Sequence, residues 1–156
     1  MAQDFDFVSA TDKPALLAFS TPEWLETARA ALQELGYKVH TAATHSDFLI
    51  RFSQFRYQVV ILVELFAANS IAENSTLQTL QNMPMSQRRH SCVILLGASF
   101  QTFTPMQAFQ QSVNTVINPS EIFLLKQLIE KSVADNDSFL HSFREAQINL
   151  YAEAKP

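Results

Sequence analysis

The sequence predicts an α/β fold in which helices cover both faces of a parallel sheet. Short apolar runs alternate along the chain with amphipathic segments, which is the pattern of repeated strand–helix units. Residues 57–65 form the clearest of these runs, because the stretch is short, mostly apolar and rich in β-branched side chains. Such a run is typical of a strand buried on both faces in the middle of a parallel sheet. The rest of the chain can be arranged around this central strand.

The first part of the chain supplies two further strands and two helices. Residues 15–19 form a short apolar run that predicts the first strand, and residues 37–43 predict the second. Between them, Thr21 and Pro22 favour the start of a helix and Gly36 favours its end. After the second strand, a capping run at residues 44–47 precedes phenylalanines at helical spacing, which predicts a second helix.

The remaining chain continues the alternation. Residues 66–75 are predicted to be a loop, residues 75–83 a helix ended by Pro84, and residues 85–90 a polar, basic connector. Residues 91–96 and 115–117 are predicted strands, with a short helix from Thr104 between them. A fifth helix is predicted over residues 120–133, an interruption at residues 135–137, and a further helix over residues 138–151. Five such units fit a flavodoxin-like, doubly wound five-stranded parallel sheet of order 2-1-3-4-5, with an extra C-terminal helix.

Composition limits the classes of function. The 156 residues suit one domain with a sizeable core, and 47% hydrophobic against 17% charged residues indicates a folded chain. The net charge of -4 argues against nucleic acid or anionic membranes as partners. No apolar run approaches the roughly 20 residues of a membrane span, and the acidic N-terminus lacks the basic start of a signal peptide. We therefore expect a soluble, cytoplasmic protein.

Glycine and cysteine usage limits the chemistry further. The chain has only two glycines, Gly36 and Gly97, so neither a dinucleotide fingerprint nor a P-loop can be built, and we expect no cofactor. Its single cysteine, Cys92, allows no internal disulfide and favours a reducing compartment. No histidine, cysteine and carboxylate pattern has metal-ligand spacing, so we expect no metal site.

Five stretches follow one another in an order and spacing shared with a known family. They are residues 16–22, 32–39, 57–63 and 92–98, and the pair Asn118-Pro119. Together they resemble the receiver domain of bacterial response regulators over about residues 14–134. The resemblance implies a signalling domain that accepts a phosphoryl group on an aspartate with the help of Mg²⁺. We expect residues 1–13 to be a flexible lead-in and residues 135–156 a C-terminal helical extension.

The chain departs from the family throughout the phosphorylation pocket that the resemblance implies. The metal-holding acidic pair falls on Phe19 and Ser20, with Thr21 next, and the phospho-acceptor falls on Val63. The remaining family groups, which are the hydroxyl residue, the lysine and the aromatic switch residue, fall on Gly97, Asn118 and Thr115. Phosphoryl transfer to a protein needs a carboxylate nucleophile, a metal and a cation, and these groups are missing together. The resemblance is therefore to a degenerate member, a pseudo-receiver without catalytic activity.

Glu64 keeps two alternatives open, because a shift of one residue would place it at the acceptor position. Its carboxylate could mimic a phosphorylated state, hold a cation or accept phosphate in an atypical receiver. It could equally be a strand-end residue that points to solvent or pairs with a neighbouring cation. A third hypothesis is a small flavodoxin-like enzyme or ligand-binding domain that uses the crevice beyond the strand ends, near Ser20, Thr21, Glu64 and Asn118.

Other candidates for chemistry have simpler structural explanations. Cys92 and His90 could share a strand face, but a buried, inert thiol is the better interpretation of Cys92. His40 and His45 have no ligand spacing, and residues 88–90 fit a solvated connector better than an anion site.

The thirteen phenylalanines suggest apolar surface beyond the needs of one core. The resemblance implies an interaction face formed by the fourth helix, the fifth strand and the fifth helix, and here the C-terminal helix extends it. The residues expected to carry this face are Phe109, Thr115, Ile117, Phe139 and Phe143. A protein partner of unknown identity, or a second copy in a homodimer, would bind there. The opposite alternative is that the tail helix folds back on its own domain.

Overall fold

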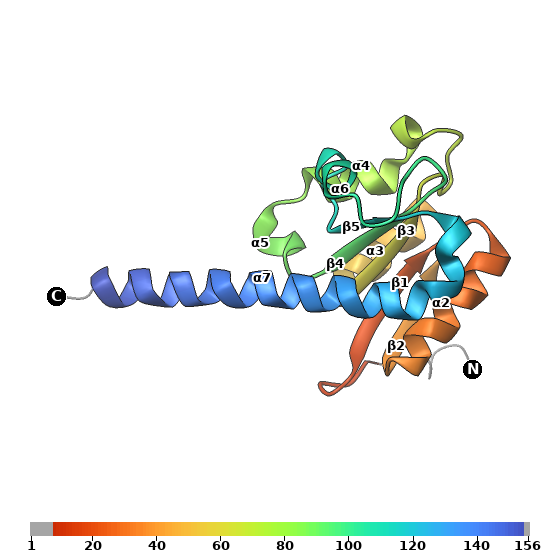
Figure 1. The fold of residues 1–156 in the computed structure, drawn as a ribbon. Helices are drawn as coiled ribbons and strands as arrows, with labels where there is room; N and C mark the ends of the chain where they lie inside the picture. The colour runs from red at the N-terminus through yellow and green to blue at the C-terminus, as the bar shows by residue number, and fades with distance from the viewer. Residues whose placement is uncertain (1–7, 155–156) are drawn as a thin grey trace.

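A computed structural model describes residues 8–154, which form a five-stranded parallel sheet flanked by helices (Figure 1). The sheet has the order β2-β1-β3-β4-β5. The fold predicted from the sequence is therefore confirmed. Its strands are β1 (Lys13–Ala18), β2 (Tyr37–Ala42), β3 (Val59–Val63), β4 (Cys92–Leu96) and β5 (Thr115–Ile117).

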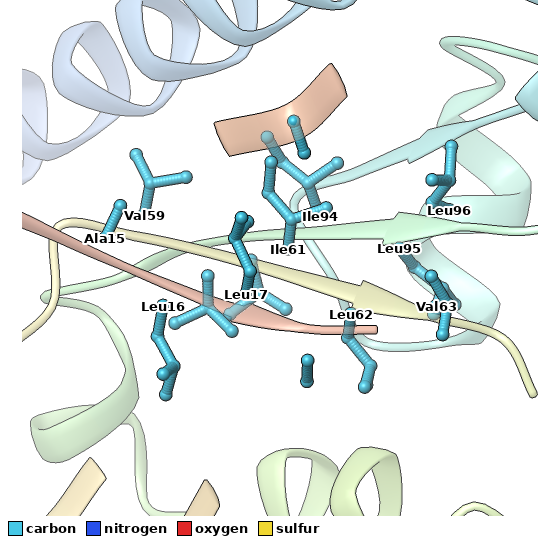
Figure 2. Close-up of a cluster of buried hydrophobic side chains, with 14 of the residues drawn as sticks. Ala15, Leu16, Leu17, Val59, Ile61, Leu62, Val63, Ile94, Leu95 and Leu96 are labelled. Carbon is cyan, nitrogen blue, oxygen red and sulfur yellow. The ribbon is translucent and has the colours of Figure 1, made fainter. Parts of the chain in front are cut away.

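The three central strands form the middle of the hydrophobic core. Every residue of β3 and β4 is buried, and so is β1 from Ala15 onward. Val59 pairs with Cys92 at the start of β3 and Val63 pairs with Leu96 at its end. Figure 2 shows their side chains projecting from both faces of the sheet. Burial on both faces explains why these strands are continuous apolar runs without alternation.

Helices form one layer on each face of the sheet. α2 and α7 pack together on one face, and α3 and α4 pack together on the other (Figures 1 and 2). The helices are α2 (Pro22–Glu34), α3 (His45–Gln54), α4 (Ser75–Asn82), α5 (Met85–Arg88), α6 (Pro105–Gln110) and α7 (Leu125–Ala154). Two 3₁₀ segments, η1 (Ile71–Glu73) and η2 (Pro119–Leu124), lie in the connections.

The helix boundaries follow from local chemistry. Pro22 occupies the first turn of α2, where its missing N–H costs nothing, and Gly36 follows the helix with a φ of +86°. The Thr44 side chain accepts a hydrogen bond from the Asp47 backbone N–H at 3.1 Å and caps α3.

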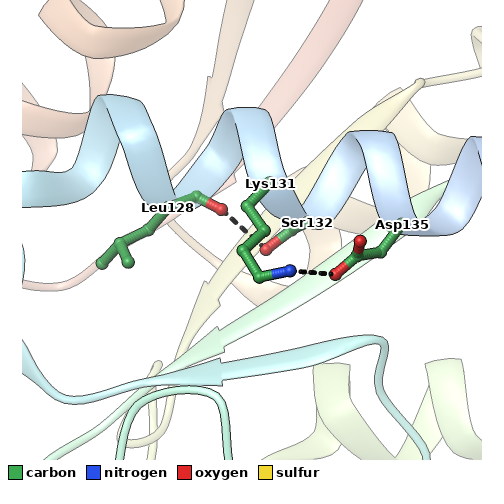
Figure 3. A network of polar contacts seen from close by, with 4 residues as sticks. All are labelled: Leu128, Lys131, Ser132 and Asp135. Carbon is green, nitrogen blue, oxygen red and sulfur yellow. Dashed lines mark hydrogen bonds and ion pairs between the residues drawn. The ribbon is translucent and has the colours of Figure 1, made fainter.

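Two predicted segments differ from the structure. Residues 85–90 are not a simple solvated connector, because they contain α5 and because Arg88 is buried. The interruption predicted at residues 135–137 is wrong, because α7 runs without a break for 30 residues. Asp135 lies within this helix, and its carboxylate forms an ion pair with the Lys131 ammonium, one turn earlier, at 3.1 Å (Figure 3). The Ser132 hydroxyl donates a hydrogen bond to the Leu128 carbonyl.

The C-terminal half of α7 continues past the body of the domain (Figure 1). Leu140 is still buried, and the Arg89 guanidinium lies 5.5 Å from the centre of the Phe143 ring. Ile148 and Leu150 are exposed. The tail therefore packs on its own domain only as far as about Phe143. The alternative in which the whole tail folds back is wrong for the residues after it.

The expected lead-in lies largely outside the described residues, because residues 1–7 are not described. Within residues 8–13, β1 already begins at Lys13, two residues earlier than predicted. The expected boundary at residue 135 falls inside α7.

Candidate functional site

The positions that the sequence singles out lie at the carboxyl edge of the sheet. Residues 19–21 follow β1, Glu64 follows β3, Gly97 follows β4 and Asn118 follows β5. The strands are parallel, so these positions meet at one edge, where ligands of such sheets usually bind.

The β1 side of this edge carries no carboxylate. Phe19 is buried in the hydrophobic core. Ser20 is exposed, and its hydroxyl lies 3.5 Å from the Leu65 carbonyl oxygen. Thr21 precedes α2 without a side-chain capping bond. Within residues 8–154, no group of three or more His, Cys, Asp or Glu side chains could hold a metal ion.

Val63 is the last residue of β3 and is buried in the core, so its side chain offers no chemistry. The ladder nevertheless continues by one bond, because the Glu64 N–H donates to the Leu96 carbonyl at 2.8 Å.

The Glu64 side chain is buried, with only 8% of the residue exposed. Its Oε1 accepts a hydrogen bond of 3.3 Å from the Ser99 backbone N–H. No Lys or Arg within residues 8–154 forms an ion pair with it. The solvent-facing interpretation of Glu64 is therefore wrong, and among the described residues nothing supports the interpretation that pairs it with a cation.

Gly97 leaves the space that the Glu64 side chain fills. A Cβ atom added at Gly97 would lie 2.5 Å from Glu64 Oε1 and 2.6 Å from Glu64 Cβ. These separations are far below van der Waals contact. A serine or threonine at position 97, as the resemblance would have it, cannot coexist with the present position of Glu64.

Asn74 was missed by the sequence analysis. It is fully buried, and its Nδ2 donates to the carbonyls of Val63 at 3.2 Å and Glu64 at 2.9 Å. Its Oδ1 accepts from the Leu77 N–H at 3.0 Å and caps α4. Asn74 thus fixes the backbone on which Glu64 stands. The only available signal was an asparagine just before the predicted helix.

Asn118 stabilises the loop after β4. Its Nδ2 donates to the Phe100 carbonyl at 2.7 Å, and its Oδ1 accepts from the Ser120 N–H at 2.9 Å. Its backbone N–H donates to Thr102 Oγ1 at 2.9 Å. The side chain that stands where the resemblance expects a lysine is therefore occupied in holding this loop and is uncharged.

The other polar candidates are structural. Burial, with a smaller contribution from Asp137 and Asp135, raises the pKa of the Cys92 thiol to about 12, which leaves it protonated and unreactive. His40 Nδ1 lies 2.7 Å from the Tyr57 hydroxyl, and His45 Nδ1 lies 2.8 Å from the Thr76 hydroxyl.

The expected interaction face divides into exposed and buried residues. Phe109 is 79% exposed, Phe139 is 68% exposed and Phe143 is 39% exposed, with the Arg89 guanidinium over its ring. Thr115 and Ile117 are buried in β5, an edge strand whose side chains are covered by the flanking layers. These two residues cannot contact a partner directly, which corrects that part of the expected face.

Comparison with known proteins identifies the fold. No protein-family model matches the sequence, and no curated protein matches it. Solved structures do match: a CheY-like receiver domain from Methanospirillum hungatei JF-1 has a TM-score of 0.63 at 14% identity, covering 82% of this chain and 98% of that one. The chain has the receiver fold.

Two further structures extend the comparison. A Francisella response-regulator receiver domain has a TM-score of 0.61 at 14% identity, covering 80% of this chain and 98% of that one. A fusion protein that contains a trimeric coiled coil from yeast Spc42 has a TM-score of 0.61 at 16% identity, covering 94% of this chain and 93% of that one. Within residues 8–154, no helix is long and apolar enough to cross a bilayer.

Proposed function

We propose that this chain is a pseudo-receiver, a cytoplasmic signalling domain that does not accept phosphate and acts through protein–protein contact. The observation that carries the proposal is the Glu64 carboxylate buried against Gly97. It fills the space where a receiver would have its hydroxyl residue, beside an edge without an acidic pair or a lysine. The domain then has one fixed state rather than two that phosphorylation interconverts.

Phosphate acceptance by Glu64 itself is the competing possibility. A carboxylate nucleophile needs access to the phosphodonor and nearby cations to offset the developing charge. Glu64 is buried and its Oε1 is already hydrogen-bonded to the Ser99 N–H. Phe19 is apolar, and Asn118 is uncharged and already donates a hydrogen bond to the Phe100 carbonyl. These contacts favour a structural carboxylate.

Incubation with Mg²⁺ and acetyl phosphate, followed by intact-mass measurement, tests the proposal. We expect no added phosphoryl mass and no shift in the melting temperature with Mg²⁺ and beryllofluoride. Glu64→Gln is the matched variant, because it keeps the size of the side chain and removes the charge. A phosphoryl adduct on the native protein that is absent from Glu64→Gln would refute the proposal and identify an active, atypical receiver.

The contact surface that we propose lies on the projecting half of α7. Phe139, Phe143 and Leu150 are separated by four and seven residues, so they lie along one side of the helix. The projecting half of α7 would be only marginally stable as an isolated helix in water, and burial of its apolar side would stabilise it. Similarity over 94% of the chain to a fusion that contains a coiled coil is consistent with a helical assembly. A second copy of this chain is the partner that such a self-complementary side fits best.

Light scattering after size exclusion tests this surface. We expect a concentration-dependent dimer for the native chain and a monomer for the double variant Phe139→Ser, Leu150→Ser. Ile148→Ser is the matched control, because Ile148 is also exposed but lies on the opposite side of α7. A native chain that stays monomeric at high concentration, or a control variant that dissociates equally, would contradict homodimerisation through this side.

A further inference from the structure

A crevice of about 560 Å³ opens at the amino edge of the sheet, at the end opposite Glu64. It lies between the C-terminal end of α3 and the segment that runs from α4 through α5 into β4. Tyr57 and Ser91, which precede β3 and β4, form part of its wall. Its volume is within the range of roughly 300–1,000 Å³ that is usual for sites of small organic ligands.

One wall of the crevice is aromatic. The rings of Phe48 and Phe52 stack with their centroids 5.4 Å apart, and Phe52 lies 6.4 Å from Tyr57 in a second stacked pair. The Phe55 ring meets Tyr57 edge-on at 6.0 Å. Phe48 and Tyr57 are fully buried and hold the partly exposed rings of Phe52 and Phe55 in place. Phe52 and Phe55 therefore offer a preformed surface for another planar ring.

The rim of the crevice is positively charged. Arg56 and His90 line the crevice. The pKa of His90 is lowered by desolvation and also by the positive charges of Arg56, Arg89 and Arg144, which all lie near it. Arginines that follow α3 and α5, together with one from the projecting half of α7, therefore lie near the same opening.

Within residues 8–154, no carboxylate forms an ion pair with Arg56, Arg89 or Arg144. Arg89 lies over the Phe143 ring, and the nearby Glu145 carboxylate is engaged by His141 at 3.1 Å. An uncompensated cationic cluster is unexpected in a chain with a net charge of -4. Its charge is complementary to an anion.

We propose that this crevice binds a small anion that carries an aromatic ring, such as an aromatic carboxylate or sulfonate. The ring packs on the partly exposed rings of Phe52 and Phe55, while the acid group meets Arg56 and His90 at the rim. The proposal goes beyond the pseudo-receiver function, because the crevice lies at the other edge of the sheet and shares no residue with the Glu64 site.

Fluorescence titration with anilinonaphthalene sulfonate, an aromatic anion, tests the proposal on the full chain. We expect saturable binding of one probe per chain and much weaker binding of its uncharged analogue, N-phenylnaphthylamine. Arg56→Gln should weaken binding of the sulfonate roughly three- to fivefold, as expected for an exposed charge pair. Lys126→Gln is the charge-matched control, because Lys126 pairs with Glu34 elsewhere on the surface, and should leave binding unchanged.

A second variant tests the aromatic wall. Ser86→Trp adds a bulky ring at the lining of the crevice and should abolish binding. If this variant does not fold, as judged by its melting curve, chemical-shift changes in the native protein decide instead, and they should cluster on Phe52, Phe55 and Arg56. Equal affinity for the two probes, no effect of Arg56→Gln, or loss of binding in the tail variant Leu150→Ser would each overturn the proposal.

Discussion

Substitution of Gly97 by alanine is the sharpest test of how the carboxyl edge is packed. The added methyl group would lie 2.5 Å from Glu64 Oε1 and 2.6 Å from Glu64 Cβ. The carboxylate end could rotate away, but the Cβ atom is fixed to a backbone that donates to Leu96 and accepts from Asn74. The strand end itself must therefore move.

Such overpacking costs roughly 1–3 kcal/mol of the free energy of unfolding. For a domain of this size each kcal/mol corresponds to a fall in melting temperature of roughly 2–4 °C. Urea unfolding of Gly97→Ala should show this loss at neutral pH. Combination with Glu64→Gly removes all the contacting atoms and should reduce the cost of the alanine to below about 0.5 kcal/mol, whereas Glu64→Ala should recover only part of it.

Gly36→Ala is the matched control. Gly36 has a φ of +86°, but the nearest atoms to an added Cβ are those of the Lys13 side chain at 3.8 Å. Its cost of about 1 kcal/mol comes from backbone conformation, so it should not depend on Glu64. If Gly97→Ala costs no more than Gly36→Ala, or if Glu64→Gly fails to relieve it, the packing of Glu64 against Gly97 is not as described here.

Three further predictions concern the supporting structure. Asn74→Asp removes the two hydrogen bonds that the Asn74 side chain donates to the carbonyls of Val63 and Glu64. It should lower the free energy of unfolding, measured in urea, by about 2–3 kcal/mol, and an unchanged free energy would contradict the role of Asn74. Cys92, with its pKa raised to about 12 from 9.0, favours folding below pH 9 and loses this contribution as pH rises toward 12. The melting temperature should fall over that pH range, and it should fall less steeply in Cys92→Ala. If the melting temperature falls equally steeply with pH in both proteins, Cys92 is not the group whose pKa is raised. Leu140→Ala should cost roughly 2 kcal/mol or more, because Leu140 is buried, while Ile148→Ala should leave thermal stability nearly unchanged.

The sequence by itself determined the sheet. The runs in β3 and β4 are apolar at every position, and the alternation with helices leaves few topologies for a chain of this length. It also determined the absence of the acidic pair after β1, because Phe19 and Ser20 cannot supply carboxylates in any fold.

The structure of residues 135–137 could not be predicted from local signals. Asp and Asn are weak helix formers, but the preference is small and tertiary contacts override it. In the folded chain Asp135 pairs with Lys131, and Asn136 Oδ1 accepts a 3.1 Å hydrogen bond from the Asn114 side chain. These contacts keep α7 continuous and carry its C-terminal half beyond the domain.

Only the tertiary structure decided the environment of Glu64. The residue follows a buried strand directly, and sequence alone cannot say whether its side chain turns outward or over the neighbouring strand. Gly97 comes from the next strand of the sheet, 33 positions further along the chain, and the parallel pairing of Val63 with Leu96 brings the two together. Burial of the carboxylate depends on a space that one missing side chain leaves open, and such a space exists only once the strands have assembled.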